Sequence, residues 1–170
     1  MKRLLTAAVA SAALMTGAAA AEPLKIVFTH HSSASNPFWQ AVKKGFDDAC
    51  AKIEANCQMI FTQTEGAIDQ QAANMMAGLA GSPDALITSI VDNNAFDGIL
   101  QQARDNGVIV IASNVDDTEG AEGNPRQAFI GQGFIPAGYS LGKKMSEFFP
   151  AEGPIKAVVG ISAPGQNWSE

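Results

Sequence analysis

The sequence predicts an α/β fold, in which a Rossmann-like parallel sheet carries helices on both faces. Three observations lead to this prediction. Short apolar, β-branched runs alternate with longer stretches whose apolar residues recur at helical spacing, as in right-handed βαβ units. The run at 108–112 is apolar at every position, as a strand buried on both faces requires. Hydrophobic residues make up 46% of the chain and charged residues 16%, so the chain can bury a core.

The first 21 residues predict a secretory signal peptide. Lys2 and Arg3 precede an apolar run from Leu4 to Met15, and small residues then lead to a cleavage site that ends at Ala21. A membrane anchor is the alternative, but the run is rich in alanine and barely long enough to span a bilayer. No cysteine follows the cleavage site, which argues against a lipoprotein anchor. We therefore expect export to the periplasm, with no direct membrane insertion after the signal is removed.

Two strand and helix units are expected between residues 24 and 79. The apolar run Leu24–Thr29 predicts the first strand. Asn36 and Pro37 predict the N-cap and the first residue of a helix, whose apolar positions continue to Ile53. The second unit comprises a strand at Cys57–Thr62 and an amphipathic helix from Ile68 to Leu79, which ends before Ser82-Pro83.

The same alternation continues to residue 131. The expected elements are a third strand at Asp84–Ile90, a helix on Phe96 to Ala103 closed by Asn106-Gly107, and a fourth strand at Val108–Ala112. The acidic, glycine-rich stretch 115–125 predicts a surface loop. Gln127–Gly131 then predicts a short strand, which is a candidate crossing between two lobes.

Two further elements are expected after this crossing. Ile135–Phe149 predicts a helix ended by Pro150, and Ile155–Ile161 predicts another strand. The sequence stops in the polar stretch that follows, at Glu170. Because a central strand of a parallel sheet needs a covering helix, we expect this sequence to be truncated.

The charge of the chain limits its partners. Seventeen acidic residues against 11 basic residues give a formal net charge of −6, and removal of Lys2 and Arg3 with the signal makes the chain more acidic still. An acidic surface repels phosphate groups, so neither nucleic acid nor an anionic membrane surface is an expected partner. A neutral or weakly charged small molecule suits this chain better.

The two cysteines of the chain are candidates for a disulfide, since an exported protein meets an oxidising compartment. Cys50 falls on the apolar stripe of the first helix and therefore faces the sheet that Cys57 enters. The six residues between them can reach back easily. Two separate core thiols remain the alternative.

Polar and aromatic residues gather where the expected strands end, which is where ligands bind in parallel α/β sheets. Hydroxyl, carboxamide and carboxylate groups grip the hydroxyls of a polyol, and an aromatic ring covers the apolar face of a sugar. These residues are His30, His31, Ser32, Ser33, Ser35, Asn36, Phe38 and Trp39 after the first strand, Asp92, Asn93 and Asn94 after the third, Asn114, Asp116 and Asp117 after the fourth, and Ser162, Gln166, Asn167 and Trp168 after the last.

Each of these positions has a plainer interpretation. Asn36 caps a helix, which is compatible with ligand contact, and the two histidines are equally suited to a loop surface. Asp116 and Asp117 are equally suited to being solvated loop charges. Trp168 is equally suited to packing beneath a helix that follows residue 170.

Neither a metal centre nor a known catalytic motif is expected. The chain has 2 histidines, and neither has a cysteine or carboxylate at chelating spacing. Gly131-Gln132-Gly133 follows a strand, but Pro136 occupies the place of the third glycine of a dinucleotide fingerprint, so no cofactor is expected. No G-x-S-x-G motif is present. A secreted hydrolase built from scattered Asp, Ser and His side chains, acting on a small carbohydrate or ester, remains the alternative function.

The order of these motifs resembles that of the ribose-type periplasmic sugar-binding proteins of ATP-binding cassette importers. The resemblance runs from about Leu24 to Glu170. Its motifs are the first strand with the following histidine, Asn36-Pro37-Phe38-Trp39, Pro83-Asp84-Ala85-Leu86-Ile87, the turn 91–96, the segment 107–114, Phe129-Ile130-Gly131-Gln132, and Ala137-Gly138. Sugar-responsive repressors share such lobes and carry a helix-turn-helix before the first strand. Here a predicted signal peptide precedes the first strand instead, so a repressor is not expected.

The resemblance implies two Rossmann-like lobes that trap a sugar or polyol between them and hand it to a membrane permease. It implies a first lobe at 22–132, a first hinge crossing at 129–132 and the beginning of a second lobe at 133–170. It also implies that the protein is not an enzyme. By motif position, the implied ligand contacts are His31 or Ser32, Asn36, Phe38, Trp39, Asp92, Asn114 and the loop Gln166, Asn167 and Trp168.

The chain departs from the family pattern in two places. Ribose-binding members tend to carry an Asp-Arg pair where this chain has Asn114-Val115, so the resemblance does not specify ribose. Members of the family also continue for roughly as long again, with the rest of the second lobe and a strand that returns to the first.

Overall fold

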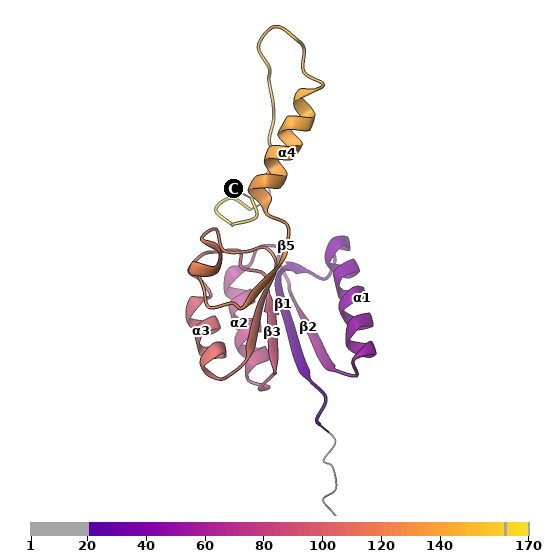
Figure 1. Ribbon diagram of the computed structural model, residues 1–170, viewed down its shortest axis with the longest axis vertical. Helices are drawn as coiled ribbons and strands as arrows, with labels where there is room; N and C mark the ends of the chain where they lie inside the picture. The colour runs from indigo at the N-terminus through magenta and orange to yellow at the C-terminus, as the bar shows by residue number, and fades with distance from the viewer. Residues whose placement is uncertain (1–20, 162, 170) are drawn as a thin grey trace, which may run out of the picture.

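The computed structural model describes residues 21–161 and 163–169, and the predicted signal peptide lies outside these residues except for Ala21. The chain alternates strands and helices as the sequence predicts (Figure 1). The elements are β1 (Lys25–Ser33), α1 (Pro37–Lys52), β2 (Asn56–Thr62), α2 (Ile68–Leu79), β3 (Ala85–Thr88), α3 (Asp97–Asp105), β4 (Ile109–Asn114), the short 3-10 helix η1 (Gly120–Glu122), β5 (Ala128–Gly131) and α4 (Phe134–Ser146).

The strands form one five-stranded parallel sheet in the order β2-β1-β3-β4-β5. The predicted α/β class with a parallel sheet is therefore confirmed. The chain passes from β1 to β2 on one side and then crosses over to place β3 on the other side of β1. β1 and β3 are therefore neighbours, and the polar residues at their carboxyl ends are brought to one place.

Helices cover both faces of this sheet, with α1 on one side and α2 and α3 on the other (Figure 1). Adjacent residues of β1 show the division, because successive side chains of a strand point to opposite faces. Val27 lies against Gly78 of α2, whereas the ring of Phe28 meets Trp39 and Phe46 of α1 edge-on. The main apolar core lies between the sheet and α2 and α3, where Met75, Leu86, Phe96, Leu100 and Val110 are fully buried.

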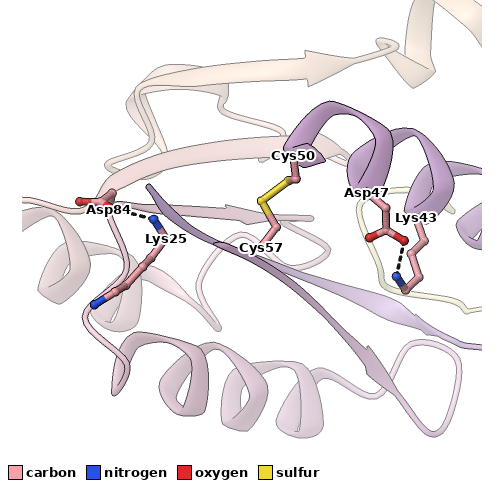
Figure 2. Close-up of a disulfide and its surroundings, with 6 residues drawn as sticks. All are labelled: Lys25, Lys43, Asp47, Cys50, Cys57 and Asp84. Carbon is pink, nitrogen blue, oxygen red and sulfur yellow. Dashed lines mark hydrogen bonds and ion pairs between the residues drawn. A yellow bond between two sulfur atoms is a disulfide. The ribbon is translucent and has the colours of Figure 1, made fainter. Parts of the chain in front are cut away.

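Cys50 and Cys57 form a disulfide in the structure, with Cα atoms 6.2 Å apart (Figure 2). Cys50 is one of the two buried residues of α1, and Cys57 is in β2. The bond therefore ties the last turn of α1 to the edge strand of the sheet. Lys43 and Asp47 on the outer face of α1 form an exposed ion pair, which contributes little to stability.

The structure corrects several boundaries and one element. β4 includes Asn114, which was predicted to follow the strand, and α4 ends at Ser146 and not at Phe149. β1 runs four residues beyond the predicted Thr29, so His30 to Ser33 belong to the strand and do not follow it. β3 is shorter than predicted and ends at Thr88. The predicted strand at 155–161 is not formed, because no neighbouring strand is present among the described residues to pair with its backbone groups.

α4 extends away from the five-stranded sheet, and the chain then returns along it toward the carboxyl end of the sheet (Figure 1). No residue of α4 is buried, and the large apolar side chains Ile135, Tyr139 and Leu141 are between 62% and 80% exposed. Within residues 21–161 and 163–169, no helix has the length and apolar character needed to cross a membrane.

Candidate functional site

The candidate site lies at the carboxyl end of the sheet, where β1, β3 and β4 deliver polar side chains to one edge. His31 and Ser32 come from the end of β1, Asp92 from the loop after β3, and Asn114 from the last position of β4. In Figure 1 the C-terminal turn, drawn in yellow, lies above this end of the sheet. Residues separated by more than 50 positions in the sequence therefore meet here, as the parallel topology requires.

The polar end of β1 is buried, and most but not all of its polar side-chain atoms are hydrogen-bonded. Nδ1 of His31 lies 2.9 Å from Oγ of Ser89, and Oγ of Ser32 donates to Oε2 of Glu65 at 2.5 Å. Burial lowers the pKa of His31 to about 4, and the Glu65 carboxylate opposes this effect. His31 is therefore a neutral imidazole near pH 7, able to donate at one nitrogen and accept at the other. Glu65 and Ser89 were not among the residues predicted from the sequence.

An aromatic cluster supports this edge from the side of α1. His30 stacks on Trp39, with ring centroids 3.9 Å apart and planes inclined by 8°. Burial, reinforced by the charge of His31, lowers the pKa of His30 to about 3. Trp39 is only 2% exposed, so most of its ring surface is occupied by protein. The stacking of Trp39 on a ligand stays a prediction, as does that of Phe38, a residue that is 53% exposed.

Asn36 begins α1 as predicted. Its backbone is extended, and its side-chain oxygen accepts a hydrogen bond from the backbone N–H of Phe38 at 3.0 Å. The following Pro37 takes the first helical position, where a missing N–H carries no penalty. The N-cap prediction is confirmed. The amide nitrogen of Asn36 has no hydrogen-bond partner among the described residues, which keeps a ligand contact compatible with the cap.

The loop after β3 is held by its own side chains. Oδ1 of Asp92 accepts from the backbone N–H groups of Asn94 and Ala95, both at 2.9 Å. Asn93 bonds to the main chain and side chain of Thr118, in the loop after β4. One carboxylate oxygen of Asp92 is thus fixed as a structural acceptor, and the other is available for a ligand.

Asn114 occupies a special backbone conformation at the end of β4. Its φ of 67° lies in the left-handed region, which asparagine tolerates better than most residues. The residue is half-buried and lines a cavity of about 290 Å³, together with Phe38 and Trp39 of α1 and Gln132 after β5. Gln132 also lines two neighbouring cavities of about 520 and 280 Å³. The hollow part of this surface is therefore centred on the exit from β5.

The C-terminal turn contacts the same edge. The backbone N–H of Asn167 donates to the carbonyl of Val91 at 2.9 Å, and its side-chain amide donates to Oδ1 of Asn93 at 2.7 Å. The side-chain amide nitrogen Nε2 of Gln166 donates to the carbonyl oxygen of Gly66 at 2.8 Å. These bonds bring residues 166 and 167, which the sequence predicted as ligand contacts, against the loops after β2 and β3.

Trp168 lies over His31, the second of the two histidines of β1. Its ring and that of His31 are 5.4 Å apart and inclined by 27°, and its Nε1 donates to the side-chain oxygen of Gln166 at 2.7 Å. The ring is half-buried against the core. In this structure, therefore, Trp168 packs on His31 at the place where the sequence predicted an aromatic cover for a ligand.

The loop after β4 contains a buried ion pair that sequence analysis did not find. Nε and Nη2 of Arg126 donate to the two carboxylate oxygens of Asp116, each at 2.5 Å. The hydrogen bond to Asp116 raises the pKa of Arg126. Asp117 is 4% exposed, and its Oδ1 accepts from the backbone N–H of Glu119 at 2.7 Å. Neither aspartate is a solvated loop charge.

Across residues 21–161 and 163–169, no group of three His, Cys, Asp or Glu side chains lies close enough to hold an ion. The groups that do meet at the edge are neutral imidazole, carboxamide, hydroxyl and carboxylate groups. Such a set binds hydroxyls by hydrogen bonds.

Comparison with known proteins extends these observations. A family model described as a periplasmic binding protein domain matches residues 26–167. A xylose/arabinose-binding protein, XylF, from Sulfolobus acidocaldarius is 27% identical over 147 residues, which are 83% of this chain and 36% of that protein.

Two solved structures share the fold. One is described as an ABC sugar transporter (periplasmic sugar binding protein) from Legionella pneumophila, with a TM-score of 0.69, 26% identity, and 73% of this chain and 45% of that chain covered. The other is described as a carbohydrate transporter from Acidothermus cellulolyticus in complex with myo-inositol. Its TM-score is 0.68 at 21% identity, and the match covers 85% of this chain and 48% of that chain. The chain spans less than half the length of these relatives.

Proposed function

This chain belongs to the periplasmic binding protein domain family, and from that premise we propose that it forms the sugar-capturing lobe of an extracytoplasmic solute-binding protein. The proposed ligand is a sugar or polyol, and the proposed partner is the membrane permease of an ATP-binding cassette importer. The observation that carries the proposal is the placement of His31, Asp92 and Asn114 at the carboxyl ends of the neighbouring strands β1, β3 and β4.

The chemistry of this edge supports a polyol. A carboxylate oxygen of Asp92 and the carboxamide of Asn114 can each take part in hydrogen bonds with hydroxyl groups. Bonds that involve a charged carboxylate contribute roughly 1.5 to 3 kcal/mol each, and neutral bonds about 1 kcal/mol. Three or four such bonds reach micromolar affinity after the costs of binding are met. The proposed contacts are His31, Ser32, Asn36, Phe38, Trp39, Asp92, Asn114, Gln166, Asn167 and Trp168.

A two-lobe arrangement follows from the same proposal, with the first lobe at 22–132 and the beginning of a second lobe at 133–170. Exposed apolar side chains support this division, such as Ile135 in α4, which is 80% exposed, and Phe148, which follows the end of α4 and is 81% exposed. Surfaces of this kind become buried when further elements pack on them. The contacts of Asn167 and Trp168 with the first lobe are then contacts across the ligand cleft.

Export to the periplasm is proposed with this function. The support is the charged, apolar and small-residue order of the first 21 residues, together with the disulfide between Cys50 and Cys57. Disulfides persist in oxidising compartments outside the cytoplasm.

A thermal-shift screen tests the proposed function. The protein, extended to the length of its relatives, is heated with pentoses, hexoses and cyclic polyols, each supplied far above a micromolar dissociation constant. A ligand at one hundred times its dissociation constant adds about 2.7 kcal/mol to the free energy of unfolding, so at least one compound should raise the Tm clearly. A screen without any shift, or turnover of a sugar or sugar ester by the purified protein, would overturn the proposal.

A further inference from the structure

A buried polar network lies directly beneath the candidate site and joins α2, β3 and β1. Gln71 of α2 and Ser89, which follows β3, are both 0% exposed. Nε2 of Gln71 donates to the carbonyl oxygen of Ser89 at 2.7 Å and lies 3.3 Å from its hydroxyl oxygen. The same hydroxyl oxygen lies 2.9 Å from Nδ1 of His31. The network thus connects a buried helix side chain to a histidine at the cleft.

The orientation of the Gln71 amide is fixed by what it contacts. The carbonyl oxygen of Ser89 can only accept a hydrogen bond, so the group that faces it must be the amide nitrogen of Gln71. That nitrogen has protons and no acceptor capacity. Gln71 therefore presents only donors to Ser89.

The hydroxyl group of Ser89 then has one possible hydrogen-bond acceptor. The hydroxyl cannot donate to the amide nitrogen of Gln71, which is itself a donor. Nδ1 of His31 is the only acceptor within hydrogen-bond distance of the Ser89 Oγ among the described residues. If His31 donated instead, the hydroxyl proton would be buried without a partner, which costs about 1 to 3 kcal/mol. Ser89 is therefore the donor and Nδ1 of His31 is the acceptor.

The position of the ring proton of His31 follows. A neutral imidazole carries one N–H, and with Nδ1 acting as acceptor that proton is on Nε2. Burial keeps the ring neutral at physiological pH, with a pKa lowered to about 4. Nε2 has no hydrogen-bond partner among the described residues, so it is the ring nitrogen left for a ligand.

We propose that Ser89 and Gln71 are positioning residues that hold His31 with its proton on Nε2, so that the ring selects an oxygen acceptor on the bound ligand. Gln71 restrains Ser89, and Ser89 donates to Nδ1. The specificity part of this inference rests on the proposed function, because it assumes a sugar in the cleft. A hydroxyl or ether oxygen can accept from Nε2–H. An ammonium group at the same place has only N–H donors, so it would face the Nε2–H donor of His31 without an acceptor between them. An amino sugar with its ammonium group at this position is therefore rejected.

Imidazole NMR tests the positioning part without any ligand. In ¹⁵N-labelled protein near pH 7, His31 should show an unprotonated nitrogen at Nδ1 and a protonated one at Nε2. The signals are assigned with the His31→Asn variant, since the chain has 2 histidines. A proton on Nδ1 in the unaltered protein would overturn the proposal, because the tautomer is measured in the unaltered protein and the variant serves only to assign the signals.

Two variants separate the positioning residues from the rest of the network. Ser89→Ala removes the donor to Nδ1, so the two ¹⁵N shifts of His31 should move toward each other as both tautomers become populated. The hydroxyl oxygen of Thr88 also lies 3.2 Å from Nε2 of Gln71, and Thr29 bonds to Thr88 at 2.9 Å. Thr29→Val is the matched control, because Thr29 has no hydrogen bond to Ser89 or His31 among the described residues. Unchanged shifts in Ser89→Ala, or equal changes in both variants, would contradict the assignment of Ser89.

Matched sugars test the specificity part. The sugar that raises the Tm most is compared with its monoamino analogues in titration calorimetry. One analogue should bind at least tenfold more weakly to the unaltered protein, and this discrimination should shrink about threefold to tenfold in Ser89→Ala. Equal discrimination in both proteins would overturn the specificity role. If no sugar binds, the proposed function fails, while the NMR result still decides the positioning role.

Discussion

Acidification from about pH 7.5 to about pH 5 should destabilise the folded chain through the two histidines of β1. His30 and His31 are 0% and 4% exposed, and burial lowers their pKa values to about 3 and about 4 from the ordinary 6.5. The unfolded chain therefore takes up protons before the folded chain does. The stability linked to these pKa values is fully present above pH 6.5 and is lost as the pH falls toward the folded values.

The size of the effect follows from the difference between the folded and unfolded pKa values. At about pH 5 the unfolded histidines are protonated and the folded ones are still neutral, so each lowers the free energy of unfolding by about 2 kcal/mol. The two together lower it by roughly 4 kcal/mol, a large share of the 5 to 15 kcal/mol typical of a domain. Histidine is the side chain with an ordinary pKa in this range, and the chain has 2 of them.

Urea unfolding at a series of pH values, followed by tryptophan fluorescence, measures this loss. The His31→Asn variant is the internal comparison, and its loss of free energy over the same pH range should be about half as large. A free energy of unfolding that stays constant between about pH 7.5 and about pH 5 would refute the reasoning. It would mean that the folded chain binds protons at these two rings as readily as the unfolded chain.

Three further results are expected. The intact mass of protein from the periplasm should correspond to a chain cleaved after Ala21, and retention of Lys2 and Arg3 would contradict export by a cleaved signal. The denatured, unreduced chain should show no free thiol, and reduction should lower the free energy of unfolding by roughly 2 to 3 kcal/mol. Gly78→Ala should cost about 1 to 3 kcal/mol in urea unfolding, because a Cβ there would lie 2.6 Å from Val27, whereas Gly45→Ala, with nothing within 4 Å, should not destabilise.

Local patterns in the sequence predicted most of the fold. Helical spacing and the Asn36-Pro37 cap placed α1, and the apolar stripe of that helix placed Cys50 on the side of the sheet, next to Cys57. These features depend on neighbours within one or two turns, so a single sequence contains the information. The expectation at 155–161 was wrong for the opposite reason, since a strand forms only when another strand pairs with it.

The sequence indicated which end of the sheet to consider for the candidate site, but not which residues form hydrogen bonds to the site residues. His31 and Asn114 follow from the rule that ligands bind at the carboxyl ends of parallel strands. The groups that orient them come from far away in the chain. Ser89 is 58 residues from His31, and Glu65 is 33 residues from Ser32. No local pattern indicates which serine or glutamate meets which strand, so these contacts required the three-dimensional structure.

The most direct test of the account is a calorimetric titration of the protein, extended to the length of its relatives, with the sugar that raises the Tm most. Asn114→Ala is compared with Asn106→Ala, which changes the same residue type near the other end of β4, at the exposed C-cap of α3. The account predicts about tenfold weaker binding for Asn114→Ala and unchanged binding for Asn106→Ala. Equal affinity of both variants and the unaltered protein would contradict a sugar site at the carboxyl edge of this sheet.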